Sequence, residues 1–327
     1  MEPLLLHDWH RSRGATFAEL NGFEVVAHHG DPAAELRAAL QGAAAFDWSA
    51  RGTLLVTGPD RLEFLQGMCT AEVKKLPPRA AAYAAFLTNK GAMVADGRLW
   101  NRGEDVAIDT EPGFIQAVRD YLQKHLVSED AEISAGGAGV AVVSVLGPEA
   151  ERVTAAAGFR DYNKEPCLVK PGVDLLVPTS ELQAVLERLA GAGAAPAGFE
   201  AWERARVEAG VPRYGQDMDE KTIPLEAGLK HAISYDKGCY VGQEVIARAT
   251  FRGHVNRQLV RLAFGEVQPA VGTVLRSGDR EVGRVTSVVK APDGSSWIGL
   301  GYVHRDLAQS TDPLALEGSG GGEARIR

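Results

Sequence analysis

The sequence contains few cysteines, and they lie far apart. Only Cys69, Cys167 and Cys239 are present in 327 residues, and none of them belongs to a C-x-x-C pair. This spacing argues against a disulfide framework and against a zinc or iron–sulfur site built within one chain. The eight histidines show no metal-ligand spacing either, so we expect no resident metal.

Long apolar runs and a positive net charge are lacking as well. No apolar run reaches the roughly 18 residues of a membrane-spanning helix, and the opening segment 1–6 is too short for a signal-peptide core. We therefore expect a cytoplasmic protein that makes no membrane contact. The formal net charge of −8 argues against a general nucleic-acid binder, although one local basic patch would be compatible with it.

The composition is that of a globular protein, with 45% hydrophobic and 24% charged residues, and a chain of this length usually forms two or three domains. Asp31-Pro32 predicts the start of a helix, and Phe199–Ala209 predicts another. Segments 83–88 and 93–100 are predicted strands joined by a tight turn, whereas 191–198 is a predicted loop. The other predicted elements are strands at 53–57, 140–146 and 173–177 and helices at 114–126 and 180–189, the last opening with a capping box.

From about Gln258 the pattern changes to short strands separated by Gly, Asp and Ser. The predicted strands cover 258–264, 281–290 and 297–303, and they indicate a small C-terminal barrel or sandwich. The glycine-rich piece at 318–322 is a predicted turn or flexible tip.

The run 237–244, Lys-Gly-Cys-Tyr-Val-Gly-Gln-Glu, is the most informative segment. Glycine beside Cys239 lets the backbone turn sharply and stay close to a ligand or partner. The nearby ammonium of Lys237 would favour the reactive thiolate. The run therefore indicates a functional site, and an inert buried cysteine beside a turn is the alternative.

Glu208 and Asp96 are two further candidates. A carboxylate can accept two parallel hydrogen bonds from a planar pair of donors, such as the edge of a pterin or of a guanidinium. Glu208 could therefore anchor a pterin, or it could pair with a neighbouring arginine. Asp96 lies in an otherwise apolar predicted strand, where an aspartate must be exposed, paired or functional.

The segments 215–219 and 223–229 are dense in turn formers and carboxylates, and they lead directly into the cysteine run. They fit either a loop that lines a cleft or a structured connection between domains. Four arginines follow the run, and they could receive carboxylates or phosphates of a ligand or form a solvated strand face. These arginines are Arg248, Arg252, Arg257 and Arg261.

Together these segments resemble the YgfZ family, which is related to the glycine-cleavage T-protein, a tetrahydrofolate-dependent aminomethyltransferase. The run 237–244 is similar to the K-G-C-Y-x-G-Q-E signature of that family and matches every fixed position. The resemblance covers nearly the whole chain. Its weak N-terminal elements lie at 46–49, 56–60 and 64–66. The segments 206–210, 214–217 and 223–229 resemble the folate-domain core that the two families share.

The resemblance implies an α+β, T-protein-like multidomain fold with a C-terminal antiparallel β-barrel. Residues 1–245 would form the folate-binding region, as two intertwined α+β subdomains, and residues 246–327 would form the six-stranded barrel. These parts would surround a central channel that holds tetrahydrofolate or a derivative.

The resemblance also implies a folate-binding factor that supports iron–sulfur cluster assembly or repair in client enzymes, including one that modifies tRNA. Glu208 would hold the pterin, and Arg248 or Arg252 would receive the glutamyl tail. Cys239, assisted by Lys237, would act as a nucleophile on a one-carbon or sulfur species, or as a transient ligand to iron. The remaining predicted cofactor contacts are Tyr240, Gln243 and Glu244.

Two departures separate the chain from the T-protein. The T-protein carries an Asp-Asp pair where only Asp96 is found here, and it lacks the cysteine at position 239. Both departures point away from aminomethyl transfer. An aminomethyltransferase or another one-carbon transferase with Asp96 as acid or base remains the alternative, and a folate sensor or RNA-contacting adaptor is a third hypothesis. The resemblance favours a monomer, and the net charge of −8 argues against a stable nucleic-acid partner.

Overall fold

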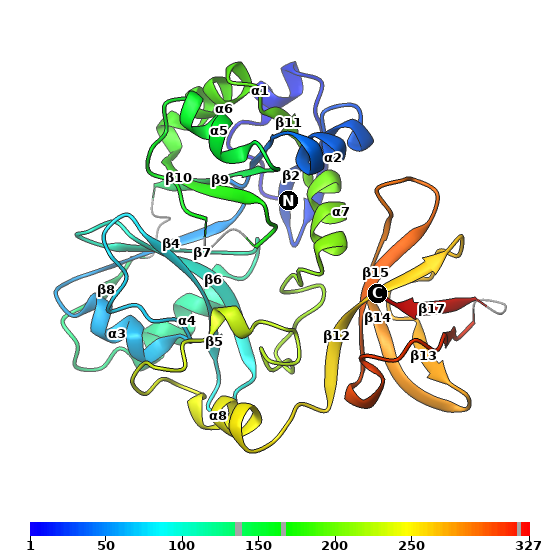
Figure 1. Cartoon of the computed structure of the whole chain (residues 1–327). Coiled ribbons are helices and arrows are strands. Elements are labelled where there is room, and N and C mark those ends of the chain that lie inside the picture. The colour runs from blue at the N-terminus through cyan, green and yellow to red at the C-terminus, as the bar shows by residue number, and fades with distance from the viewer. Residues whose placement is uncertain (135–138, 165–167, 319–321) are drawn as a thin grey trace. The chain divides into compact units, whose positions relative to one another are not determined.

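The computed structural model describes residues 1–134, 139–164, 168–318 and 322–327. Cys167 and most of the predicted tip at 318–322 therefore lie outside the described residues. The chain forms two compact units (Figure 1). The first unit comprises Met1–Leu87, Val94–Trp202 and Ala232–Val241, and the second comprises Thr88–Met93, Glu203–His231 and Gly242–Arg327. No helix within the described ranges is long and apolar enough to cross a membrane.

The first unit begins with a short helix and a hairpin. Helix α1 (His7–Ser12) precedes strands β1 (Thr16–Leu20) and β2 (Phe23–His28), which pair antiparallel. Asn21 and Gly22 form the turn, with positive φ angles of 51° and 90°. A two-residue hairpin turn needs this backbone conformation, and Asn-Gly adopts it more readily than other pairs.

A four-stranded sheet with the order β10–β9–β3–β11 follows in the first unit. Its branched residues, such as Val143 and Leu175, pack with Leu182 and Leu189 of the covering helix α6 in one buried core. This packing explains why the apolar segments 140–146 and 173–177 predict two strands of this sheet, β9 and β10. The strands are β3 (Ala44–Asp47), β9 (Val140–Leu146), β10 (Gly172–Pro178) and β11 (Ala195–Ala197), and the helices are α2 (Pro32–Gln41), α5 (Ala150–Ala156) and α6 (Leu182–Gly191).

Two local predictions are wrong in this region, and one is confirmed. Ala195–Ala197 lies in the predicted loop but forms β11, which pairs parallel with β3 through backbone groups and so needs no side-chain pattern. The helix predicted from residue 180 begins with a 3-10 turn at Thr179–Glu181 and makes no capping-box hydrogen bond. The helix start at Asp31 is confirmed, because its carboxylate accepts two backbone N–H groups of the first turn.

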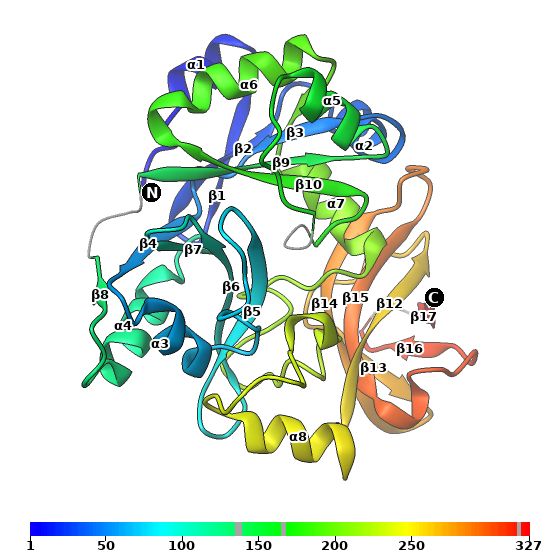
Figure 2. The same cartoon turned by 60° about the vertical axis from the view of Figure 1, so that its left-hand side comes forward.

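The first unit also contains a five-stranded sheet with the order β5–β6–β7–β4–β8. Helices α3 and α4 lie side by side next to this sheet (Figures 1 and 2), and Val118 and Leu122 of α4 are fully buried. The strands are β4 (Gly52–Thr57), β5 (Ala81–Leu87), β6 (Met93–Asn101), β7 (Val106–Thr110) and β8 (Glu132–Ile133), and the helices are α3 (Arg61–Met68) and α4 (Ile115–His125).

The second unit contains a closed barrel of six antiparallel strands, in the order β12–β15–β14–β13–β16–β17. Its core is built from residues such as Leu262, Phe264 and Val285, and the predicted C-terminal barrel is thus confirmed. Helix α7 (Phe199–Ala209) enters this unit at Glu203, and α8 (Gln243–Phe251) precedes the barrel. The strands are β12 (Arg257–Gly265), β13 (Val274–Ser277), β14 (Arg280–Lys290), β15 (Trp297–His304), β16 (Leu314–Leu316) and β17 (Glu323–Ile326), with 3-10 turns at Lys230–Ala232 and Arg305–Leu307. The domain boundary at residues 245/246 stays a prediction.

Candidate functional site

Cys239 lies in the first unit and is exposed, whereas the residues on either side of it are anchored. Lys237 is buried, and its Nζ donates hydrogen bonds to the backbone oxygens of Cys69, at 2.8 Å, and Ala71, at 2.5 Å. Tyr240 is also buried, and its ring centroid lies 5.1 Å from the Lys237 ammonium. The exposed thiol therefore stands on a segment that is held on both sides.

These contacts give Lys237 surroundings that the sequence did not predict. Its ammonium donates to carbonyls in the segment that follows α3, and burial lowers the pKa of that ammonium. The predicted assistance to the Cys239 thiol stays a prediction. The buried, inert alternative describes Cys69 rather than Cys239, because Cys69 is only 1% exposed and burial raises the pKa of its thiol.

Of the predicted cofactor residues that follow Cys239, Tyr240 lies in the first unit, whereas the others lie in the second unit. Gln243, Glu244 and Arg248 are on helix α8, and Arg252 is the residue that caps its C-terminal end. Gly242 precedes the helix with a φ of 84°, a left-handed conformation that glycine adopts without strain. Glu244 and Arg248, one turn apart, form an exposed ion pair with an N–O distance of 2.9 Å. The structure thus brings Glu244 and Arg248 together with Arg252 along one helix, where they line a cavity of about 370 Å³.

Glu208, the predicted pterin anchor, lies near the end of α7 and carries a bidentate ion pair. Its two carboxylate oxygens accept hydrogen bonds from Nη1 and Nη2 of Arg327, each at 2.9 Å. Arg261 donates to the backbone oxygen of Glu208 at 3.2 Å. Of the two interpretations of Glu208 from the sequence, the structure shows the pairing with an arginine. The guanidinium of Arg327 presents two parallel N–H donors to the two oxygens of the Glu208 carboxylate.

A buried ion pair that the sequence did not predict fixes α7 to the loop that follows it. Arg206 is fully buried, and its Nη1 donates to Oδ2 of Asp217 at 2.8 Å. Oδ2 also accepts the backbone N–H of Arg213 at 3.1 Å. The other oxygen, Oδ1, accepts the hydroxyls of Thr286 and Ser287 of β14 at 2.6 and 2.7 Å. Asp217 is therefore a structural anchor between the loop and the barrel.

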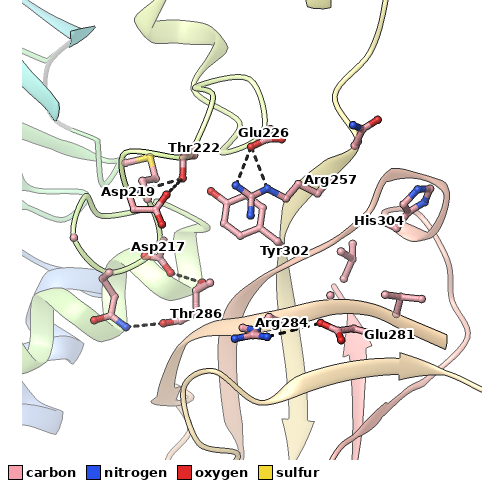
Figure 3. A pocket seen from close by; sticks show the side chains of 17 residues that line it. Asp217, Asp219, Thr222, Glu226, Arg257, Glu281, Arg284, Thr286, Tyr302 and His304 are labelled. Atoms are coloured by element: carbon pink, nitrogen blue, oxygen red, sulfur yellow. Dashed lines mark hydrogen bonds and ion pairs between the residues drawn. The ribbon is translucent and has the colours of Figure 1, made fainter. Parts of the chain in front are cut away.

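The same loop, which includes residues 215–219 and Glu226, lines a cleft of about 990 Å³ in the second unit. A loop that lines a cleft is one of the two interpretations of this segment from its sequence. Figure 3 shows Asp219 and Glu226 from the loop facing Tyr302 and Arg257 from the barrel. Glu226 accepts from Arg257 at 3.1 Å, and the Arg257 guanidinium lies 4.5 Å from the centroid of the Tyr302 ring. Three of the four predicted basic residues, Arg248, Arg257 and Arg261, thus already have partners within the chain.

Asp96 lies on β6 in the first unit, where it is 5% exposed. The hydroxyl of Tyr83 donates a hydrogen bond to its Oδ2. Desolvation by burial raises the pKa of Asp96 to about 6, and the nearby carboxylate of Glu111 adds to the shift, whereas Arg51 opposes it. A carboxyl group in this state can hold or release a proton close to neutral pH.

Comparisons with known proteins agree with an α+β protein that ends in an antiparallel barrel. The GCVT N-terminal domain family matches residues 6–165 and 170–237, and the glycine cleavage T-protein C-terminal barrel domain matches 257–325. The chain therefore belongs to the glycine cleavage T-protein family, and the predicted T-protein-like fold is confirmed.

The relatives include both aminomethyltransferases and a YgfZ protein. The chain is 30% identical to an aminomethyltransferase of Rubrobacter xylanophilus, over 95% of this chain and 90% of that protein. It is also 30% identical to the tRNA-modifying protein YgfZ of Yersinia enterocolitica, over 80% and 84%. The crystal structure of the glycine cleavage system aminomethyltransferase T from Bartonella henselae has a TM-score of 0.87 at 21% identity and covers 100% of this chain and 96% of that chain.

Proposed function

We propose that this protein is a folate-binding accessory factor of the YgfZ type, which supports iron–sulfur enzymes through the thiol of Cys239. The observation that carries the proposal is the exposed Cys239 on a segment anchored by buried Lys237 and Tyr240. A group that reacts with an incoming partner must be held in one place, and the anchored neighbours of Cys239 hold its exposed thiol in this way. An exposed cysteine without such a role would be a liability to oxidation.

The thiol would act on a partner rather than hold a cluster by itself. An iron–sulfur cluster usually takes about four protein ligands, and no cluster of three or more His, Cys, Asp or Glu side chains suited to a metal occurs in the described part of the chain. Cys239 would therefore serve as a nucleophile toward a one-carbon or sulfur species, or as one transient ligand shared with a client enzyme.

Tetrahydrofolate or a derivative is the proposed cofactor, and Glu208 fits its pterin. The carboxylate already accepts the two parallel N–H donors of Arg327, and the aminopyrimidinone edge of a pterin presents the same pair of donors. Arg248 on α8, or Arg252 at its C-terminal cap, would receive the carboxylates of the glutamyl tail. When bound, the folate would supply a carrier for a one-carbon unit.

The test is rescue of a cluster-dependent enzyme in a strain that lacks this factor. Wild-type protein should restore the enzyme's activity, and Cys239→Ser should not, although it should fold and bind tetrahydrofolate normally. Cys69→Ala is the matched control, because it removes the buried thiol and should retain rescue if the protein accumulates. Full rescue by Cys239→Ser would refute the thiol mechanism.

An aminomethyltransferase is the second candidate, and the state of Asp96 favours it. A buried carboxyl with a pKa of about 6, bonded to the Tyr83 hydroxyl, could exchange a proton during one-carbon transfer. The assay is methylene-tetrahydrofolate formation from an aminomethyl-loaded carrier protein. Activity in the wild type that is lost in Asp96→Asn would favour this function over the first.

A further inference from the structure

A separate cavity, partly open to solvent, lies within the first unit, where α1, α6 and β11 meet. Figures 1 and 2 both show α1 and α6 side by side, and Pro196 and Ala197 of β11 complete this part of the lining. The cavity has a volume of about 180 Å³. None of the residues proposed for folate or thiol chemistry lines it. Its lining consists of Trp9, His10, Arg13, His29, Ala45, Asp47, Leu186, Glu187, Ala190, Ala194, Pro196 and Ala197.

The inner wall of this cavity combines apolar side chains with two imidazoles. Ala45, Leu186 and Ala194 are buried and supply apolar surface. His10 is 3% exposed, and His29 is half-buried. The Nδ1 atoms of both rings are buried and have no hydrogen-bond partner within the described residues. Unsatisfied buried polar atoms are rare in folded proteins, so two of them at one cavity indicate a missing partner.

Asp47 determines what the first of these nitrogens can bind. Nε2 of His10 donates to Oδ2 of Asp47 at 2.9 Å, and the other oxygen of Asp47 accepts the backbone N–H of Ser49 at 2.8 Å. With the Nε2 proton directed at Asp47, a neutral His10 ring carries its lone pair on Nδ1, which can accept a hydrogen bond. Burial lowers the pKa of His29 to about 4, so this second ring is neutral at neutral pH.

The mouth of the cavity carries paired charges. Arg13 donates to Glu187 at 3.2 Å, and Glu187 also accepts from the indole N–H of Trp9 at 3.0 Å. The Arg13 guanidinium lies over the Trp9 ring, 4.0 Å from its centroid. The charges of Arg13 and Glu187 offset each other, and the two oxygens of Asp47 accept hydrogen bonds from His10 and from the Ser49 backbone. An anionic ligand would find no unpaired cationic side chain among the lining residues and would lose its hydration on entry.

We propose that this cavity binds a neutral, single-ring aromatic or heteroaromatic compound whose one O–H or N–H group donates a hydrogen bond to Nδ1 of His10. The size fits, because a protein cavity of roughly 150 Å³ can hold benzene. The apolar wall buries the ring, and His10 sets the orientation of the polar group. This site is independent of the proposed folate and thiol function.

Ligand-observed NMR titration of the full chain with phenol, toluene and benzoate tests the proposal. Phenol should bind about five-fold more tightly than toluene, which has the same shape but no donor. Benzoate should bind more weakly than either. Failure of phenol to bind would mean that the cavity holds only water and would overturn the proposal, and equal affinities for phenol and toluene would overturn the role of His10.

A matched pair of variants on α6 locates the binding. Ala190 lines the mouth of the cavity and is exposed, so Ala190→Leu should fill the entrance without disturbing the fold and should weaken phenol binding at least ten-fold. Ala184 is exposed on the same helix but does not line the cavity, so Ala184→Leu should bind phenol like the wild type. Equal phenol affinities in the two variants would place the ligand elsewhere and overturn the proposed site.

Discussion

Replacement of Arg327 by alanine should strengthen tetrahydrofolate binding if Glu208 is the pterin anchor. In the structure, both carboxylate oxygens of Glu208 accept hydrogen bonds from the Arg327 guanidinium. A pterin edge needs the same two oxygens, so the ligand and Arg327 compete for one carboxylate. The variant removes the competitor and leaves the acceptor in place.

The expected gain is small because the ion pair is partly solvated. The side chains of Arg327 and Glu208 are 36% and 27% exposed, and ion pairs at such positions contribute up to about 1 kcal/mol. Releasing the carboxylate from a pair of that strength corresponds to roughly five-fold tighter binding. The loss of affinity in Glu208→Gln should be larger, because an amide has a single acceptor oxygen and cannot accept two parallel hydrogen bonds side by side.

Anaerobic isothermal titration calorimetry with tetrahydrofolate measures these affinities. Arg325→Ala is the control. Arg325 pairs with Glu323 on the same strand, so its replacement removes an equal charge without changing a contact of Glu208. Unchanged affinity in both Arg327→Ala and Glu208→Gln would refute the assignment of Glu208 to the pterin. An equal gain in Arg325→Ala would show that net charge, and not competition, is responsible.

Three further outcomes are expected. Iodoacetamide should modify the exposed Cys239 in the folded protein and the buried Cys69 only after unfolding, and peptide mass mapping that found equal rates would contradict this. Because burial raises the pKa of Asp96 from 3.8 to about 6, the folded state binds the extra proton and the free energy of unfolding falls as the pH rises through this window. Urea unfolding should therefore show the wild type losing up to about 3 kcal/mol relative to Asp96→Asn between pH 4 and pH 7, and parallel profiles would argue against the shift. Arg206→Met should lower the free energy of unfolding by about 3–5 kcal/mol, because it leaves Asp217 buried without its counterion, and a loss below about 1 kcal/mol would show that the carboxylate finds another partner.

The regular elements could be predicted because local patterns determine them. Asp31 with the proline that follows it specifies the start of α2, and the turn-separated strands after Gln258 indicate the barrel. Strand β11 could not be predicted in this way. Its three residues, Ala195–Ala197, are too few to show an alternation, and the strand exists only because β3 offers it a backbone partner.

Most contacts of the candidate site could not be predicted from local sequence patterns. Lys237 bonds to backbone carbonyls that lie 168 and 166 residues earlier, and Glu208 meets an arginine 119 residues later. Motif spacing shows which residues are chemically able to act, but the fold decides which partner each of them meets. The exposure of Cys239 and the burial of Asp96 likewise depend on packing that no single segment encodes.

The coordination of Asp217 has a consequence for assigning functions to related sequences. A carboxylate offers about four acceptor positions, and here Arg206, the Arg213 backbone and the two hydroxyls of β14 take four. No acceptor position is left on Asp217 for a substrate, so this carboxylate serves the architecture whatever reaction the protein supports. A match at Asp217 alone should therefore not be used to separate transferases from accessory factors.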